Sequence, residues 1–295
     1  PCHSSLLLQP SLLTQGWRDT LLLQRLQCRQ EAIMQLLQIT HHNWAEAFYI
    51  TLAHNFGFHT NSLPFETLAL CTPLAYLLKH RNSLFQVTAI LLGQSGLLNK
   101  QTIKNEEEAA LLREYQFLKQ KFSLQSMAAL LWKRARLRPQ NAPQIRIRQF
   151  AQLICQSEWL FSQMLVQPTV NDLRQLLCLQ SPTTSAEDTQ SIISAPPAIG
   201  KKSIDILLIN TLLPYRYAYA LAHSDTTAAQ MALTLMQQIP AEDNTIIRQW
   251  RLLGQQVTSA ADTQALIHLY QHYCQNERCI HCEVGQQVFL LNHIS

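Results

Sequence analysis

The stretch that decides the fold is SLFQVTAILLGQSGLL, residues 83–98. Ser83 and Gln86 form a capping-box pattern at its start, and this pattern typically opens an α-helix. Apolar residues follow at helical spacing, and the glycines at 93 and 96 supply a stop. The stretch is too short and too amphipathic to span a membrane. We therefore expect a helix over about 83–95 that does not span a membrane.

The same signals recur along the whole chain and predict an all-α fold, an irregular array of many helices. The 295 residues include 50 leucines and 34 glutamines, both good helix formers, whereas 7 glycines are too few for the turns of a β-sandwich. The chain contains neither of the glycine-rich signatures of nucleotide-binding α/β enzymes. The predicted helices are 16–39, 43–56, 64–79, 83–95, 105–121, 123–135, 143–166, 169–180, 203–213, 215–223, 225–238, 242–255, 259–274 and 280–290.

A polar stretch divides the predicted helices into two groups. Residues 181–202 contain three prolines and no periodic pattern, which is typical of a loop or linker. We therefore predict a helical subdomain at 1–180 and another at 203–295, with a cut near residue 190. The Ile- and Leu-rich stretch that follows the linker leaves one alternative open, a short buried strand near 203–210.

Positive charge is concentrated in one window, Tyr115–Ser157, which has eight basic and no acidic residues. Such clustering is typical of a surface that binds phosphate, and interleaved aromatic rings can stack on bases. The alternative is a set of solvated helix faces, with the aromatic rings in the core. The predicted nucleic-acid contacts are Trp132, Lys133, Arg134, Arg136, Arg138, Arg146 and Arg148, and further aromatic rings stand at Phe117, Phe122 and Phe150.

Cysteines and histidines are concentrated near the C-terminus. His268 and His272 lie four residues apart, hence on one helical face, and cysteines follow with the spacing C-x4-C-x2-C. Zinc prefers four nitrogen or sulfur ligands, so zinc is the candidate cofactor. The predicted ligands are His272, Cys274, Cys279 and Cys282. The alternatives are cysteines that pack as small apolar residues and a reversible disulfide between Cys279 and Cys282.

No sequence signature of a familiar active site is present. The chain lacks the G-x-S-x-G, H-E-x-x-H and kinase patterns, and it has only 19 acidic residues. Most of the eight cysteines are scattered singly, which fits free thiols in a reducing cytoplasm. No secretory signal is recognisable, and the chain does not begin with Met. We expect a piece of a longer cytoplasmic protein without a complete active site of its own.

Several strings together resemble an uncharacterised bacterial family that is classed as a domain of unknown function. They are NFGF (55–58), PFETLA (64–69), KHRNSLFQVTAILLGQSGLL (79–98), REYQFLKQKF (113–122), LRPQNAPQIRIRQFAQL (137–153), GKKSIDILLINTLLP (200–214), IPAEDNTIIRQWRLLG (239–254) and the segment ADTQALIHLYQHYC with its trailing cysteines (261–282). The resemblance implies a helical C-terminal part of a longer protein whose N-terminal region is nuclease-like. It departs at 181–199, where the family carries aromatic and histidine residues.

Together these observations predict a helical accessory module of a nuclease-like protein, which binds DNA or RNA backbone through its arginines. A protein-interaction scaffold that does not bind nucleic acid is the first alternative. A metal-dependent enzyme that uses the C-terminal cysteines is the second, and it would need an open coordination position on the metal.

Overall fold

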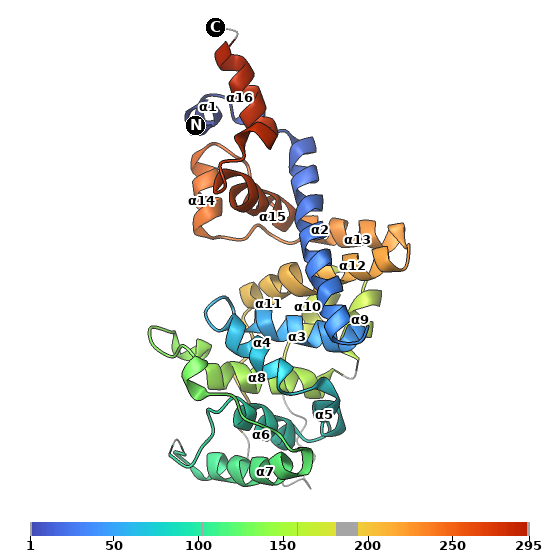
Figure 1. Cartoon of the computed structure of the whole chain (residues 1–295), viewed down its shortest axis with the longest axis vertical. Coiled ribbons are helices and arrows are strands. Elements are labelled where there is room, and N and C mark those ends of the chain that lie inside the picture. The colour runs from blue at the N-terminus through green and yellow to red at the C-terminus, as the bar shows by residue number, and fades with distance from the viewer. Residues whose placement is uncertain (1, 102, 158, 181–193, 294–295) are drawn as a thin grey trace. The chain divides into compact units, whose positions relative to one another are not determined.

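The computed structural model describes residues 2–101, 103–157, 159–180 and 194–293, and these residues form an all-α fold (Figure 1). Among them no β-strand occurs, and an isolated antiparallel bridge joins Pro240 to Ser259. The predicted fold class is therefore confirmed. The strand considered near 203–210 is absent, because helix α11 covers Lys201–Leu207 and a π-helical segment covers Leu208–Leu212.

The chain folds as two compact units. The terminal unit contains residues 1–36 and 212–295, and the central unit contains residues 37–211. The chain thus passes from one unit to the other at 36/37 and again at 211/212. The cut predicted near residue 190 falls within 181–193, outside the described residues, and it stays a prediction.

The central unit is built around helix α6, which packs against α7 and α8. Val87, Ile90 and Leu91 of α6 are fully buried, so this helix forms the middle of the core. The helices are α3 (Trp44–Phe56), α4 (Ser62–Leu70), α5 (Leu74–Lys79), α6 (Leu84–Gln94), α7 (Glu106–Phe122), α8 (Pro143–Gln156), α9 (Leu160–Val166), α10 (Val170–Leu177) and α11.

Two predicted helices of the central unit are broken in the structure. The helix predicted at 64–79 is divided into α4 and α5 by Pro73, which has no N–H for a helical hydrogen bond. The helix predicted at 143–166 is divided into α8 and α9, because Ser157 adopts an extended conformation with φ −107° and ψ 102°.

The prediction of a helix at 123–135 is wrong. Ser123 ends α7 in a left-handed conformation, with φ 52°. The chain then follows the end of α6, where the Met127 N–H donates to the Gln94 carbonyl (2.8 Å) and the Trp132 indole N–H to the Ser95 carbonyl (2.9 Å). These tertiary hydrogen bonds replace those of a helix, and a short 3-10 turn at Ala129–Leu131 is the regular structure that remains.

The terminal unit contains helices from both ends of the sequence. They are α1 (His3–Leu8), the larger part of α2 (Gln15–Ile39), α12 (Leu213–Ala222), α13 (Thr226–Gln238), α14 (Thr245–Leu252), α15 (Ala260–His268) and α16 (Glu283–His293). Helix α15 packs against α13 and α14 and continues as a π-helical segment, Leu269–Cys274. Helix α1 was not predicted, because its six residues are too few to show a periodic pattern.

Polar contacts tie α2 to the C-terminal part of the terminal unit. Arg18 donates to the Gln256 carbonyl and to the Gln255 side chain, both at 2.7 Å. Further along α2, Gln24 accepts a hydrogen bond from the Tyr273 hydroxyl at 2.9 Å. Residues at the two ends of the sequence are therefore held in one unit.

Candidate functional site

A positively charged loop joins α7 to α8, and we call residues 128–142 the basic loop. Asn61 holds it by the backbone of Lys133: its amide donates to the Lys133 carbonyl (3.1 Å) and its oxygen accepts from the Lys133 N–H (2.9 Å). The inner side of the loop is fixed by Trp132. The backbone of this otherwise irregular segment is therefore anchored to the core at two consecutive residues.

Four of the predicted contact residues lie exposed on this loop, namely Lys133, Arg134, Arg136 and Arg138. Within the described part of the chain none of the four forms an ion pair. Arg136 has a φ of 59°, in the left-handed region that arginine rarely adopts. The loop thus presents four side-chain charges to solvent without a neutralising carboxylate.

The other predicted contacts are not on this surface. Trp132 is 5% exposed and belongs to the core, so no base can stack on it in this conformation. Arg148 forms a short ion pair with Glu107 across α8 and α7, and both side chains are largely buried. The sequence could not show this pairing, because Glu107 lies outside the acid-free window.

Arg146 is buried beside the basic loop, 9% exposed. It donates to Gln149 (3.0 Å) and Asn141 (2.6 Å), and its guanidinium lies 4.3 Å from the centre of the Phe58 ring. Its Nε has no hydrogen-bond partner among the described residues. Burial lowers the pKa of Arg146. A small hollow opens here, lined in part by Arg146, Asn141 and Asn61, and its donors suit an anion.

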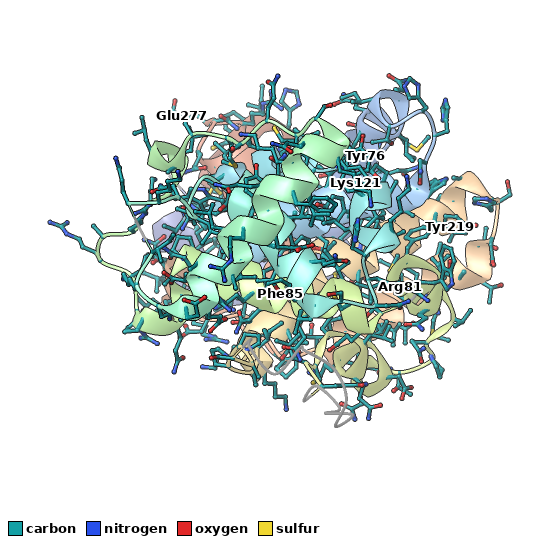
Figure 2. The ribbon with its side chains drawn as sticks, turned by 90° about the horizontal axis from the view of Figure 1, so that it is seen from below. Tyr76, Arg81, Phe85, Lys121, Tyr219 and Glu277 are labelled. Carbon is teal, nitrogen blue, oxygen red and sulfur yellow. The ribbon has the colours of Figure 1, made fainter. Side chains whose placement is uncertain are left out.

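The first cations of the window sit in a different setting, at the end of α7. Tyr76 of α5 stacks on Phe122 with ring centres 4.8 Å apart, and the Lys121 ammonium lies 5.3 Å from the Phe122 ring centre. Figure 2 labels Tyr76 and Lys121 in this region. Phe150 is buried, whereas Phe117 is 61% exposed and is the most accessible aromatic ring of the window.

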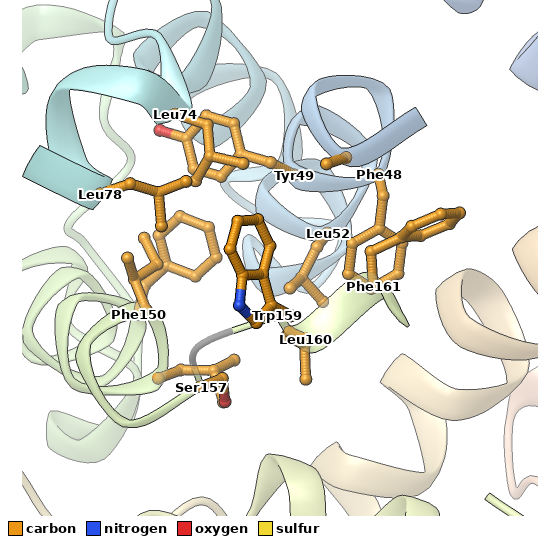
Figure 3. Close-up of a pocket in the computed structure, with 13 residues that line it drawn as sticks. Phe48, Tyr49, Leu52, Leu74, Leu78, Phe150, Ser157, Trp159, Leu160 and Phe161 are labelled. Carbon is orange, nitrogen blue, oxygen red and sulfur yellow. The ribbon is translucent and has the colours of Figure 1, made fainter. Parts of the chain in front are cut away.

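An apolar pocket occupies another part of the central unit (Figure 3). Its walls come from α3, α5, α8 and α9 and include Tyr49, Leu78 and Phe150. Trp159 stands at this pocket and is 61% exposed, which is unusual for so large an apolar side chain. The sequence pattern did not single out this residue.

In the terminal unit the C-terminal cysteines gather around one small cavity together with a residue from the other end of the chain. Its lining includes four thiols, which we call the cysteine cluster: Cys2, Cys274, Cys279 and Cys282. Burial, and then the neighbouring Cys279 and Cys282, raise the pKa of the Cys2 thiol. Although Cys274 as a residue is exposed, burial of its thiol and then the neighbouring cysteines raise its pKa to about 12. Sequence spacing missed Cys2, because 271 residues separate it from the next member.

His272, the fourth predicted ligand, is placed with other partners. One donor atom each from Cys28, His268 and His272 lies within 4.8 Å of the others. The two imidazole rings stack with centres 4.1 Å apart. Burial, and after it His272 and Arg25, lower the pKa of His268 to about 4. Burial and the nearby arginines also lower the pKa of His272, so both stacked rings are in their neutral forms. Cys28 gave no signal in the sequence, because it stands alone within α2.

No described helix is long and apolar enough to cross a membrane. No curated protein and no solved structure matches this sequence. Residues 1–245 match a family described as "Protein of unknown function (DUF2851)", and this match spans the whole central unit and most of the helices that the resemblance covered. The chain therefore belongs to the DUF2851 family of proteins of unknown function.

Proposed function

We propose that the central unit binds the phosphate backbone of nucleic acid through the basic loop, as a helical accessory module of a nuclease-like protein. One observation carries the proposal: four exposed cations stand on a single anchored loop, and no ion pair neutralises them within the described residues. Arginine forks bind phosphate oxygens in pairs, and three of the four cations are arginines.

The hollow at Arg146 supports the same chemistry. Its unpartnered Nε and the neighbouring Asn141 offer hydrogen-bond donors beside the exposed charges. A phosphate seated there would be contacted by a guanidinium whose position is already fixed by Gln149. Contacts of this kind carry little base information, so we expect binding to depend weakly on sequence.

The test is fluorescence-anisotropy titration of single- and double-stranded DNA and RNA at about 50 and 200 mM salt. Four phosphate contacts give a log–log salt slope of roughly −3.6 on duplex DNA, hence about a hundredfold loss of affinity over this range. Reversing Arg134, Arg136 and Arg138 to Glu should weaken binding and make the slope shallower by about 2.7.

A matched control reverses Lys104, Lys201 and Lys202, which are exposed and lie in the same unit. It changes the net charge equally but leaves the basic loop intact. If both triple variants bind alike, the effect is one of overall charge and the loop has no special role. If the unaltered protein does not bind at low salt, the proposal is wrong.

The second candidate is a protein-interaction scaffold, and the exposed Trp159 favours it. An indole at the mouth of an apolar pocket is the kind of side chain that dominates protein interfaces. This function needs no phosphate contact. Absence of nucleic-acid binding would therefore favour the protein-interaction function over the nucleic-acid-binding function.

A further inference from the structure

We propose that the cysteine cluster binds one zinc ion through four thiolates and that this site joins the two ends of the chain. The four thiols come from three separate segments: Cys2 precedes α1, Cys274 ends the π-helical segment, and the last two stand on a turn before α16. All of them line the same small cavity. Three of the thiols lie within residues 274–282, and folding brings Cys2 to them from the other end of the sequence.

The walls of this cavity suit a soft metal. Apart from the thiols, the lining residues are Leu6, Trp250, Leu269, Tyr273 and Val284, so that no carboxylate or imidazole contributes. Calcium and magnesium require oxygen ligands, whereas a set of four sulfurs is typical of zinc or iron. The apolar walls would also shield the metal–sulfur bonds from water.

Burial raises the pKa of the Cys282 thiol above its ordinary value, but nearby N–H groups would stabilise its sulfur once a metal ion had displaced the proton. Cys282 stands at the N-terminus of α16, where its sulfur interacts with the backbone N–H groups of Val284 and Gly285. The indole N–H of Trp17 is buried without a hydrogen-bond partner of normal geometry and faces the same sulfur. A thiol is a weak acceptor, but a metal-bound thiolate would satisfy all three donors.

Gly285 allows α16 to approach the turn that carries Cys279. A Cβ atom at this position would lie 2.1 Å from the Cys279 carbonyl oxygen, so any other residue would push the helix and the turn apart. The close approach keeps Cys279 and Cys282 at the cavity. The spacing C-x2-C-x2-G is therefore explained by the geometry of the site.

The neighbouring group of Cys28, His268 and His272 is the competing metal site. Its donor atoms lie within 4.8 Å of one another, a spacing that no three thiols of the cysteine cluster reach in the described structure, so those thiols would have to draw together around an ion. Arg25 and Arg29, however, carry positive charge within electrostatic range of the competing group. Two guanidinium groups oppose binding of a cation. The cysteine cluster has the more favourable surroundings, so we assign the zinc there.

Binding exchanges protons for the metal. Each thiol loses its proton as its sulfur bonds to zinc, so four protons are released and the charge of the site becomes −2. Four protein ligands complete the tetrahedral coordination of zinc and leave no position for a substrate. The ion would therefore be structural, which disfavours the metal-dependent enzyme considered from the sequence.

The experiment measures metal content of the purified full chain by elemental analysis, then replaces zinc by cobalt and records the visible spectrum. We expect about one zinc per chain and intense cobalt bands typical of a tetrahedral thiolate site. Cys2→Ser and Cys279→Ser should each lower zinc retention during dialysis against a chelator at least tenfold. Cys71→Ser and Cys178→Ser, at exposed lone cysteines, are matched controls that should retain the metal.

Three results would overturn the assignment. A protein that remains metal-free after reconstitution with zinc has no such site. Loss of zinc in Cys28→Ser and His272→Ala, with retention in Cys2→Ser, places the metal in the competing group. An iron–sulfur absorption spectrum assigns the thiols to a cluster instead of zinc. Because Cys2 precedes the first helix, its replacement removes a ligand without altering the core, so a folding defect does not obscure the result.

Discussion

At the scale of single residues, the Asn55 side chain forms hydrogen bonds at a place where a proline interrupts the backbone hydrogen bonds of a helix. In an α-helix the Asn210 carbonyl would accept from the N–H of residue 214, but that residue is Pro214 and has none. The helix widens into the π-helical segment at this point. Asn55 compensates: its amide donates to the Asn210 carbonyl (3.2 Å) and to the Thr211 hydroxyl (2.9 Å).

Replacing Asn55 by Ala should therefore destabilise the central unit by about 1–3 kcal/mol, because it removes two side-chain hydrogen bonds from a partly buried position. In a Pro214→Ala background the same change should cost less, because residue 214 then has an N–H of its own. Urea unfolding of the four proteins of this double-mutant cycle measures the difference. Equal costs in both backgrounds would show that Asn55 does not compensate for the proline.

At the scale of elements, helices with strong start signals were predicted from the sequence, and segments held by tertiary contacts were not. The N-caps at Asn43, Ser83 and Asn105 act locally, so the helices that follow begin within a residue or two of the predicted positions. Residues 123–135 have a helical pattern, but hydrogen bonds to the end of α6 override it. The clustering of charge was visible in sequence, whereas the burial of Arg146 and the Glu107 partner of Arg148 depend on packing between helices.

The capping box of α15 makes stability depend on pH. Burial alone raises the pKa of Asp262, but hydrogen bonds from Ser259 and Thr258 outweigh it and lower the pKa below its ordinary value of 3.8. An acid with a lowered folded-state pKa adds stability above its unfolded pKa and loses it as the pH falls through the folded value.

Asp262→Asn should therefore lower the free energy of unfolding by about 1 kcal/mol at neutral pH. The difference from the unaltered protein should shrink as the pH falls below about 4, because the natural carboxyl is then protonated too. Urea unfolding at several pH values between neutral and acid measures it. A difference that stays constant with pH would mean that the carboxylate charge is irrelevant to the cap.

At the scale of the whole molecule, the proposed functions belong to different units. The basic loop lies in the central unit, whereas the cysteine cluster lies in the terminal unit. The sequence predicted a metal site at the C-terminal cysteines, but it could not predict Cys2 as a member of the cluster, because only folding brings Cys2 to the same cavity. The zinc would contribute to stability and the loop to binding.

Removal of zinc by a chelator should thus reduce hydrogen-exchange protection in α1, in the turn Cys279–His281 and in α16. The central unit should keep its protection, because none of the cluster's thiols lies in 37–211. Mass spectrometry of exchange with and without chelator tests this, and nucleic-acid affinity should be unchanged under both conditions. Equal loss of protection in both units would refute the separation of roles.

The division of the terminal unit between the two ends of the sequence has a consequence for biosynthesis. Residues 1–36 leave the ribosome before the central unit is made, whereas the remainder of their own unit, 212–295, is made after it. Leu21 and Leu26 are buried in the folded protein. The part of their unit formed by 212–295 is not available to them until the entire central unit has been synthesised. The central unit can fold during this interval, because domains fold as units as they emerge. The apolar side chains of segment 1–36 therefore stay exposed on the nascent chain for longer than those of the central unit.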